Sequence, residues 1–142
     1  MNFLIDSLIV FYITLDSLKI FNLNAKLFEF DNYKIENETL KISTKSISGI
    51  KNYKILDKNN NSNFGKIYFE KGKSANYFII FFERENWYAF GITEKPSSIW
   101  INDSVIDLIN GQFFYKKLNN APYKLKVVKN KIIILKEFNF KW

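Results

Sequence analysis

The chain lacks histidine and cysteine, and its 21 basic residues are all lysines except Arg84. Without histidine, no side chain has an ordinary pKa suited to proton transfer near neutral pH. Without cysteine, the chain has no disulfide scaffold, thiolate nucleophile or thiolate metal site. The five glycines are isolated, so no glycine-rich phosphate loop is present. These absences disfavour the common classes of enzyme, and we expect neither a cofactor nor a bound metal.

The acidic residues form no recognised catalytic pattern. Glu36 and Glu38, like Glu83 and Glu85, are two residues apart and would share one face of a strand. Such a pair could bind Mg²⁺, although acids at turns and strand edges are more often simply solvated. We therefore expect a protein that is not an enzyme, with an enzyme using only lysine, tyrosine or aspartate as the alternative.

Length and composition predict a single globular domain over residues 1–142. An apolar fraction of 47% and an aromatic fraction of 18% are sufficient for a packed core at this length. The longest uncharged run near the start, residues 7–15, is much shorter than the roughly 20 residues needed to span a bilayer. No basic segment precedes this run, so we expect no secretory signal and a cytoplasmic protein.

Short β-branched and aromatic segments recur along the chain, separated by turn signals every 8–12 residues or so. About twelve such strands predict a mainly β fold, a single-domain antiparallel sandwich or barrel. The run at residues 77–82 is apolar on both faces, which predicts a central strand covered on both sides. The remaining predicted strands are residues 8–14, 18–23, 26–30, 33–36, 39–44, 47–56, 64–70, 87–92 and 99–101, followed by two or three in the C-terminal segment.

Residues 102–118 have two interpretations. Asn110-Gly111 between apolar segments 105–109 and 112–115 predicts a hairpin with a type I′ turn. The alternative is a short helix near residues 103–110 that ends at Gly111, which would make the fold α+β. We favour the hairpin because that helix would consist mostly of poor helix formers.

Positive charge is concentrated at the end of the chain. The net charge is +7, and Glu137 is the only acid after Gly111. Lysines alternate with apolar residues over 123–127, which predicts a hairpin with one apolar and one cationic face. That face could bind a partner, or it could simply keep a sheet soluble and block pairing between sheet edges. The candidate binding residues are Lys116, Lys117, Lys124, Lys126, Lys129 and Lys131, with Tyr115 and Tyr123.

A second candidate site surrounds the turn at residues 83–86. Arg84, Trp87 and Trp100 are of the types enriched at the centres of protein interfaces, and Tyr88 lies beside Trp87 in the sequence. The alternative is that both tryptophans belong to the core and that Arg84 pairs with the neighbouring glutamates.

Together these features predict a binding protein that occupies an acidic protein or nucleoprotein surface through the C-terminal lysines. An inhibitor or immunity-type protein of an AT-rich bacterium or phage fits one domain with no catalytic motif and many residues with AT-rich codons. One alternative is sequence-independent binding of RNA or DNA through the same face, with tyrosines stacking on bases. Another is a β-barrel that encloses a lipid or other apolar small molecule among its aromatic side chains.

Overall fold

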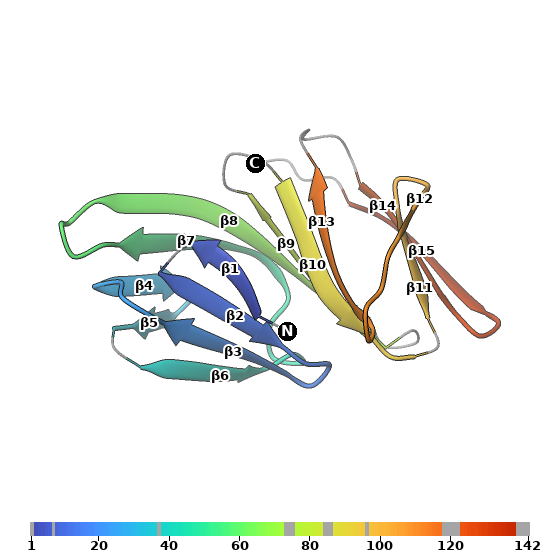
Figure 1. Ribbon diagram of the computed structural model, residues 1–142, viewed down its shortest axis with the longest axis horizontal. Helices are drawn as coiled ribbons and strands as arrows, with labels where there is room; N and C mark the ends of the chain where they lie inside the picture. The colour runs from blue at the N-terminus through green and yellow to red at the C-terminus, as the bar shows by residue number, and fades with distance from the viewer. Residues whose placement is uncertain are drawn as a thin grey trace.

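The computed structural model describes the backbone of residues 2–6, 8–36, 38–72, 76–83, 87–95, 97–117 and 123–138. It describes the side chains of residues 8–36, 38–72, 76–82, 88–95, 97–114 and 124–135. These residues form three antiparallel sheets and no helix (Figure 1). The N-terminal sheet contains, in spatial order, β1 (Asn2–Asp6), β2 (Ile9–Ile13), β3 (Ser17–Asn22) and β6 (Thr39–Ser43). The central sheet contains β13 (Gln112–Lys117), β10 (Trp87–Thr93), β9 (Tyr77–Glu83), β8 (Ser62–Lys71), β7 (Gly49–Leu56), β4 (Leu27–Phe30) and β5 (Tyr33–Ile35). The C-terminal sheet contains β12 (Ser104–Ile106), β11 (Ser98–Ile101), β14 (Tyr123–Lys129) and β15 (Ile132–Phe138).

The central sheet curves through the molecule, with the N-terminal sheet over one part and the C-terminal sheet at the other end (Figure 1). One core fills the space between the N-terminal and central sheets, where Phe11 packs edge-on against Phe28 and Phe90. The other core lies between the C-terminal and central sheets and includes Phe113 and Val127. The mainly β sandwich predicted from the sequence is therefore confirmed.

Strand β9 contributes to both cores, as its sequence predicts. Phe78, Ile80 and Phe82 belong to the first core, whereas Tyr77, Ile79 and Phe81 belong to the second. Successive residues of a strand point to opposite faces of the sheet, and both faces are covered here, so all six side chains are buried.

Strand β10 lets the C-terminal sheet approach the central sheet closely. Its residues Ala89 and Gly91 lie on the face that packs against the C-terminal sheet, whereas Phe90 belongs to the other core. A Cβ atom on Gly91 would meet the carbonyl oxygen of Phe78 and lie 3.1 Å from the ring of Phe113. Small residues on this face therefore leave room for Phe113.

The interval between residues 102 and 118 differs from the prediction in one respect. Asn110 and Gly111 both have positive φ, at 53° and 80°, as a type I′ turn requires. The backbone groups of Ile109 and Gln112 exchange two hydrogen bonds of 2.9 Å across this turn. However, residues 105–109 do not form one strand of a hairpin with β13, because β12 ends at Ile106 and pairs with β11. The alternative helix near 103–110 is also wrong.

The hairpin that forms instead joins β11 to β12 through Asn102 and Asp103. Both residues have positive φ, at 49° and 66°, and Ile101 pairs with Ser104 across them. Asparagine and aspartate tolerate this left-handed conformation better than most residues. This Asn-Asp pair was the available sequence signal for the turn, and the stronger Asn-Gly signal obscured it.

Other strand predictions are confirmed with small shifts in their ends. The strand β1 was not predicted, and β8 begins at Ser62, two residues before the strand predicted over residues 64–70, which shortens the polar loop that follows β7. That loop is held by Asp57, whose carboxylate accepts hydrogen bonds of 2.8 and 2.9 Å from the backbone N–H groups of Asn59 and Asn61. The backbone hydrogen bond from Asn61 above all, and then those from the Asn61 side chain and the Asn59 backbone, lower the pKa of Asp57. In the described part of the chain, no helix is present that could cross a membrane.

The turn at Gly111 provides a test of how closely the central sheet is packed. Replacing Gly111 with alanine should reduce the free energy of unfolding by about 1–2 kcal/mol through the positive φ. It should cost about 1–3 kcal/mol more because the new Cβ would meet the backbone carbonyl of Thr93. Gly49→Ala is the matched control, since Gly49 has a φ of 84° but nothing within 4 Å of the new Cβ. Equal losses in urea denaturation would contradict the close approach at Gly111.

Candidate functional site

The backbone divides the predicted lysine patch between two sheets. Lys116 and Lys117 lie on β13 of the central sheet, where they pair with Tyr88 and Trp87 of β10. Lys124, Lys126 and Lys129 lie on β14 of the C-terminal sheet, and Lys131 follows in the turn to β15. The side chains of Tyr115, Lys116, Lys117, Tyr123 and Trp87 lie outside the described residues, as does the whole of Arg84.

The second predicted site is also divided. Tyr88, next to Trp87, is half-buried on the central sheet and stacks on Phe82 with ring centroids 4.9 Å apart. Trp100 lies on β11 of the C-terminal sheet and pairs with Lys126 of β14. The turn at residues 84–86, which was expected to join them, lies outside the described residues. Trp87 therefore pairs with Lys117 on the central sheet, whereas Trp100 pairs with Lys126 on the C-terminal sheet.

The C-terminal sheet has an inner face that forms the second core and an outer face that points away from it. Ile99, Ile101, Leu125 and Val127 are buried on the inner face. Residues between them in the strand therefore point outward. The outer face, as defined here, contains Ser98 and Trp100 of β11, Val105 of β12, Lys124, Lys126 and Val128 of β14, and Ile133 and Leu135 of β15.

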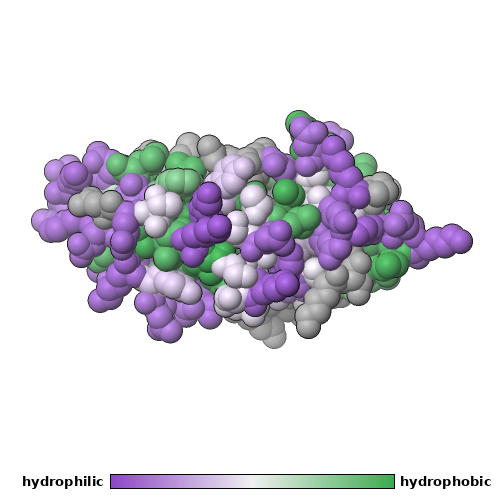
Figure 2. Space-filling view, turned by 90° about the horizontal axis from the view of Figure 1, so that it is seen from below, coloured by the Kyte–Doolittle hydropathy of each residue, from purple (hydrophilic) through white to green (hydrophobic). Residues whose placement is uncertain are grey.

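Aliphatic side chains are strongly exposed on this outer face. The exposed fractions are 74% for Leu135, 60% for Ile133 and 56% for Val105. Figure 2 shows hydrophobic side chains at the surface among hydrophilic ones at the right-hand end, where the C-terminal sheet lies. The expected purely cationic face is therefore wrong, because β15 supplies apolar residues on both of its faces. Charge on the described outer face comes from Lys124 and Lys126.

Lys126 and Trp100 form the centre of the outer face. The register aligns Val105, Trp100, Lys126 and Leu135 in one row across the four strands. The Nζ atom of Lys126 lies 4.9 Å from the ring centroid of Trp100, within the range of a cation–π interaction. This contact holds the lysine over the ring and covers part of the aromatic surface.

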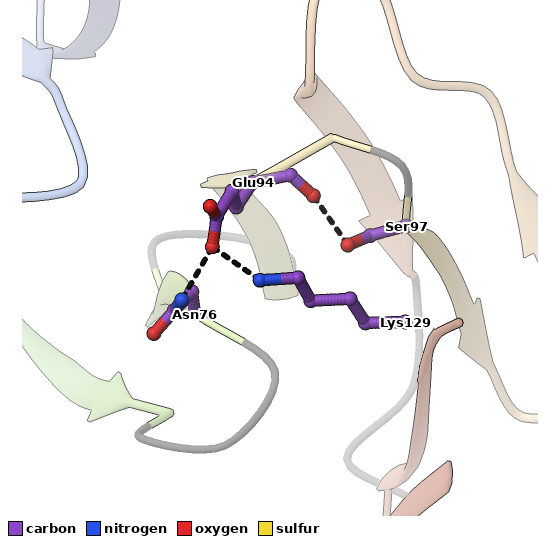
Figure 3. A network of polar contacts seen from close by, with 4 residues as sticks. All are labelled: Asn76, Glu94, Ser97 and Lys129. Carbon is purple, nitrogen blue, oxygen red and sulfur yellow. Dashed lines mark hydrogen bonds and ion pairs between the residues drawn. The ribbon is translucent and has the colours of Figure 1, made fainter. Parts of the chain in front are cut away.

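Lys129 does not belong to this outer face. It follows Leu125 and Val127 in the period-two pattern, so its side chain points inward and is only 16% exposed. Its ammonium group forms an ion pair with the carboxylate of Glu94, which follows β10 (Figure 3). The structure therefore separates Lys129 from Lys124 and Lys126, the other predicted binding residues of β14. Extending the alternation of residues 123–127 by one step would have placed Lys129 correctly.

The Glu94 carboxylate connects the C-terminal hairpin to the central sheet. It accepts hydrogen bonds from Lys129 and from the side-chain amide of Asn76, which precedes β9 (Figure 3). The carbonyl oxygen of Glu94 accepts a further bond from the Ser97 hydroxyl. Hydrogen bonds from Lys129 and then Asn76 lower the pKa of Glu94 below its ordinary value.

A cleft of about 910 Å³ lies beside this network. Glu94 and Asn76 line it together with residues of the β2–β3 turn, the β6–β7 connection and the end of β8. In its wall the Lys71 amine donates a 2.6 Å hydrogen bond to the carbonyl of Leu15, and burial lowers its pKa. Sequence reasoning did not identify this cleft, because its walls come from segments far apart in the chain. In the described residues, no three acidic side chains gather closely enough to bind a metal.

No family model matches this chain, and no curated protein or solved structure matches it. We therefore infer its function from the geometry of the outer face and the groups around it.

The lowered pKa of Glu94 predicts a specific pH dependence of stability. A carboxyl group with a depressed folded-state pKa stabilises the fold above its unfolded pKa of about 4.3, and this contribution is lost as pH falls through the folded value. Glu94→Gln should therefore lower the urea midpoint at pH 7, and its difference from wild type should shrink at acidic pH. Glu38→Gln changes an exposed glutamate and is the control. A difference for Glu94→Gln that is constant from pH 7 to pH 3 would contradict the ion pair.

Proposed function

We propose that this chain is a binding protein that occupies an acidic surface of another protein through the outer face of its C-terminal sheet. The observation that supports this most directly is the exposure of Leu135, Ile133 and Val105 around Lys126 and Trp100. Exposed apolar side chains bordered by cations are typical of surfaces that become buried in a complex. An arrangement of this kind also fits the inhibitor or immunity-type class of protein inferred from the sequence.

The lysines contribute a preference for acidic partners. The net charge of +7 attracts acidic surfaces and accelerates their association, and Lys124 and Lys131 are exposed close to the apolar side chains. Lys126, which lies over Trp100, brings a cation to the middle of the apolar area. Aliphatic contacts would supply affinity, while the lysines would select partners by charge.

Binding of RNA or DNA through the same face remains the second candidate, with less support. Lys129 is engaged inside the molecule by Glu94, which removes one of the expected phosphate contacts. Trp100 is covered by Lys126, so a base would have to displace this lysine before it could stack. The aliphatic side chains of Leu135 and Ile133 cannot form hydrogen bonds or ion pairs with a phosphate backbone. A nucleoprotein partner would have to present protein to this face.

An enclosed apolar ligand has less support than either. The described strands form three open sheets, and their aromatic side chains pack on one another in the two cores. For example, the rings of Phe28 and Phe30 are stacked, with their centroids 5.5 Å apart. Within the described residues, rings packed in this way fill the two cores rather than line a cavity inside them.

A charge-reversal experiment tests the proposed function. Replacing Lys124, Lys126 and Lys131 with glutamate changes the net charge from +7 to +1, because each replacement removes one positive charge and adds one negative charge. Replacing Lys34, Lys41 and Lys58 makes the same change at exposed positions on β5, β6 and the β7–β8 loop. We expect tagged wild-type protein and the control to capture the same proteins from a lysate of the source organism, before and after nuclease treatment.

The variant of the C-terminal sheet should lose those proteins by a factor of about ten or more, since it replaces attraction with repulsion at the contact. Its far-ultraviolet circular dichroism should match that of wild type, because all three lysines are outside the cores. Equal capture by both variants would contradict the proposed surface. Capture that disappears with nuclease would favour the nucleic-acid candidate instead.

A further inference from the structure

Strand β15 forms an open edge of the C-terminal sheet. In the described part of the chain it pairs with β14 alone, and it is seven residues long, from Ile132 to Phe138. The other edge strands of the three sheets are β1, β5, β6, β12 and β13. Of these, β5 and β12 have three residues each, and β6 presents exposed polar residues at Thr39, Lys41 and Ser43. Short or charged edges of that kind resist pairing with other chains, which is how proteins ordinarily protect a sheet.

The edge at β15 lacks this protection over its described side chains. Ile132, Ile133 and Leu135 are all exposed, and the lysines Lys124 and Lys126 lie one strand further in, on β14. The interpretation of these lysines as protection of the sheet edge therefore does not fit their position. An exposed apolar edge with no proline is suited to pairing with another strand.

The register shows which backbone groups of β15 are open. Lys129 pairs with Ile132 across the two-residue turn, and in an antiparallel ladder hydrogen-bonded pairs alternate with non-hydrogen-bonded pairs. The backbone of Ile132 and Ile134 is therefore directed to β14. The N–H and C=O groups of Ile133 and Leu135 are directed to the open edge.

From this edge we infer that the partner adds a strand to the C-terminal sheet, using an extended segment that pairs with β15. The inference rests on the proposed function and specifies how the partner binds. The added strand would take up the open backbone groups of Ile133 and Leu135, and its outward side chains would pack beside theirs. Apolar or β-branched residues are therefore expected at the centre of the segment.

Charge identifies the rest of the segment and argues against a second copy of this chain. Lys131 stands at one end of the open edge and Lys124 lies on the outer face of the neighbouring strand. Two copies would bring together two molecules of net charge +7. An acidic residue on the partner beside Lys131 would instead be attracted. The expected segment is extended, apolar at its centre and acidic at the end next to the β14–β15 turn.

The test begins with a displayed library of random 12-residue peptides selected on the folded full chain. We expect the enriched peptides to alternate β-branched or apolar residues with others, to carry acidic residues and to lack proline at their centre. The tightest peptide is then synthesised in two forms, one N-methylated at the odd-numbered residues and the other at the even-numbered residues. The methyl groups of the two forms therefore lie on opposite edges of the added strand. The form methylated on the edge facing β15 should bind about tenfold more weakly or worse, while the other should bind within a few fold of the parent.

Two variants of the chain provide the matching test on the protein side. Leu135→Pro removes the open backbone N–H group of residue 135. Leu135→Ala shortens the side chain but keeps that N–H group. Peptide binding to Leu135→Pro should be about tenfold weaker than binding to Leu135→Ala. The peptide forms need only the wild-type chain, so the test holds even if Leu135→Pro does not fold.

The outcomes separate strand addition from the proposed function. Equal binding of both methylated forms and of both Leu135 variants would overturn strand addition, and the proposed function would stand if the triple lysine variant still lost the partner. If neither set of variants affected binding, both would be overturned. Sedimentation equilibrium that showed a wild-type dimer converted to a monomer by Leu135→Pro would also overturn the inference, since a second copy would then occupy the edge.

Discussion

Burial of β9 on both faces is the constraint on which the rest of the structure depends. Its alternating side chains supply one half of each core, so the N-terminal and C-terminal sheets are held to opposite faces of the same strand. Fully burying a large apolar side chain contributes about 1.5–3 kcal/mol, and six consecutive residues of β9 are buried in this way. Because both cores share the strand, a substitution that loosens packing on one face should also weaken packing on the other face.

The contact between Lys129 and Glu94 fixes the C-terminal hairpin at a second point. Val127 anchors β14 in the apolar core, and two residues later the same face of the strand carries a lysine that needs a partner. A poorly exposed ammonium group is costly unless it is paired and hydrogen-bonded, and Glu94 supplies that partner at the end of β10. Asn76 connects the carboxylate to the start of β9, so the network connects the hairpin to the two strands that carry the shared core.

Anchoring one face of the hairpin leaves the other face available to the proposed partner. The inner residues of β14 are fully engaged, whereas the outer face combines Lys126 and Trp100 with exposed aliphatic side chains. A rigid sheet is a good platform for binding, since little conformational entropy is lost when a partner contacts it. The open edge of β15 adds backbone hydrogen-bonding groups to that platform, next to the side chains that would give it selectivity.

The sequence by itself determined the strand class, the double coverage of residues 77–82 and the type I′ turn at Asn110-Gly111, because period-two alternation and positive-φ residues are local properties. It also indicated where positive charge is concentrated and which catalytic groups are missing. Tertiary structure alone decided that β13 pairs with β10 of the central sheet, and that Lys116 and Lys117 lie on a different sheet from Lys124. It also decided that β15, an apolar run with no alternation to mark an inner face, stands at an open edge. Strand pairing joins residues far apart in the chain and is selected by the packing of whole sheets, so no local pattern specifies it.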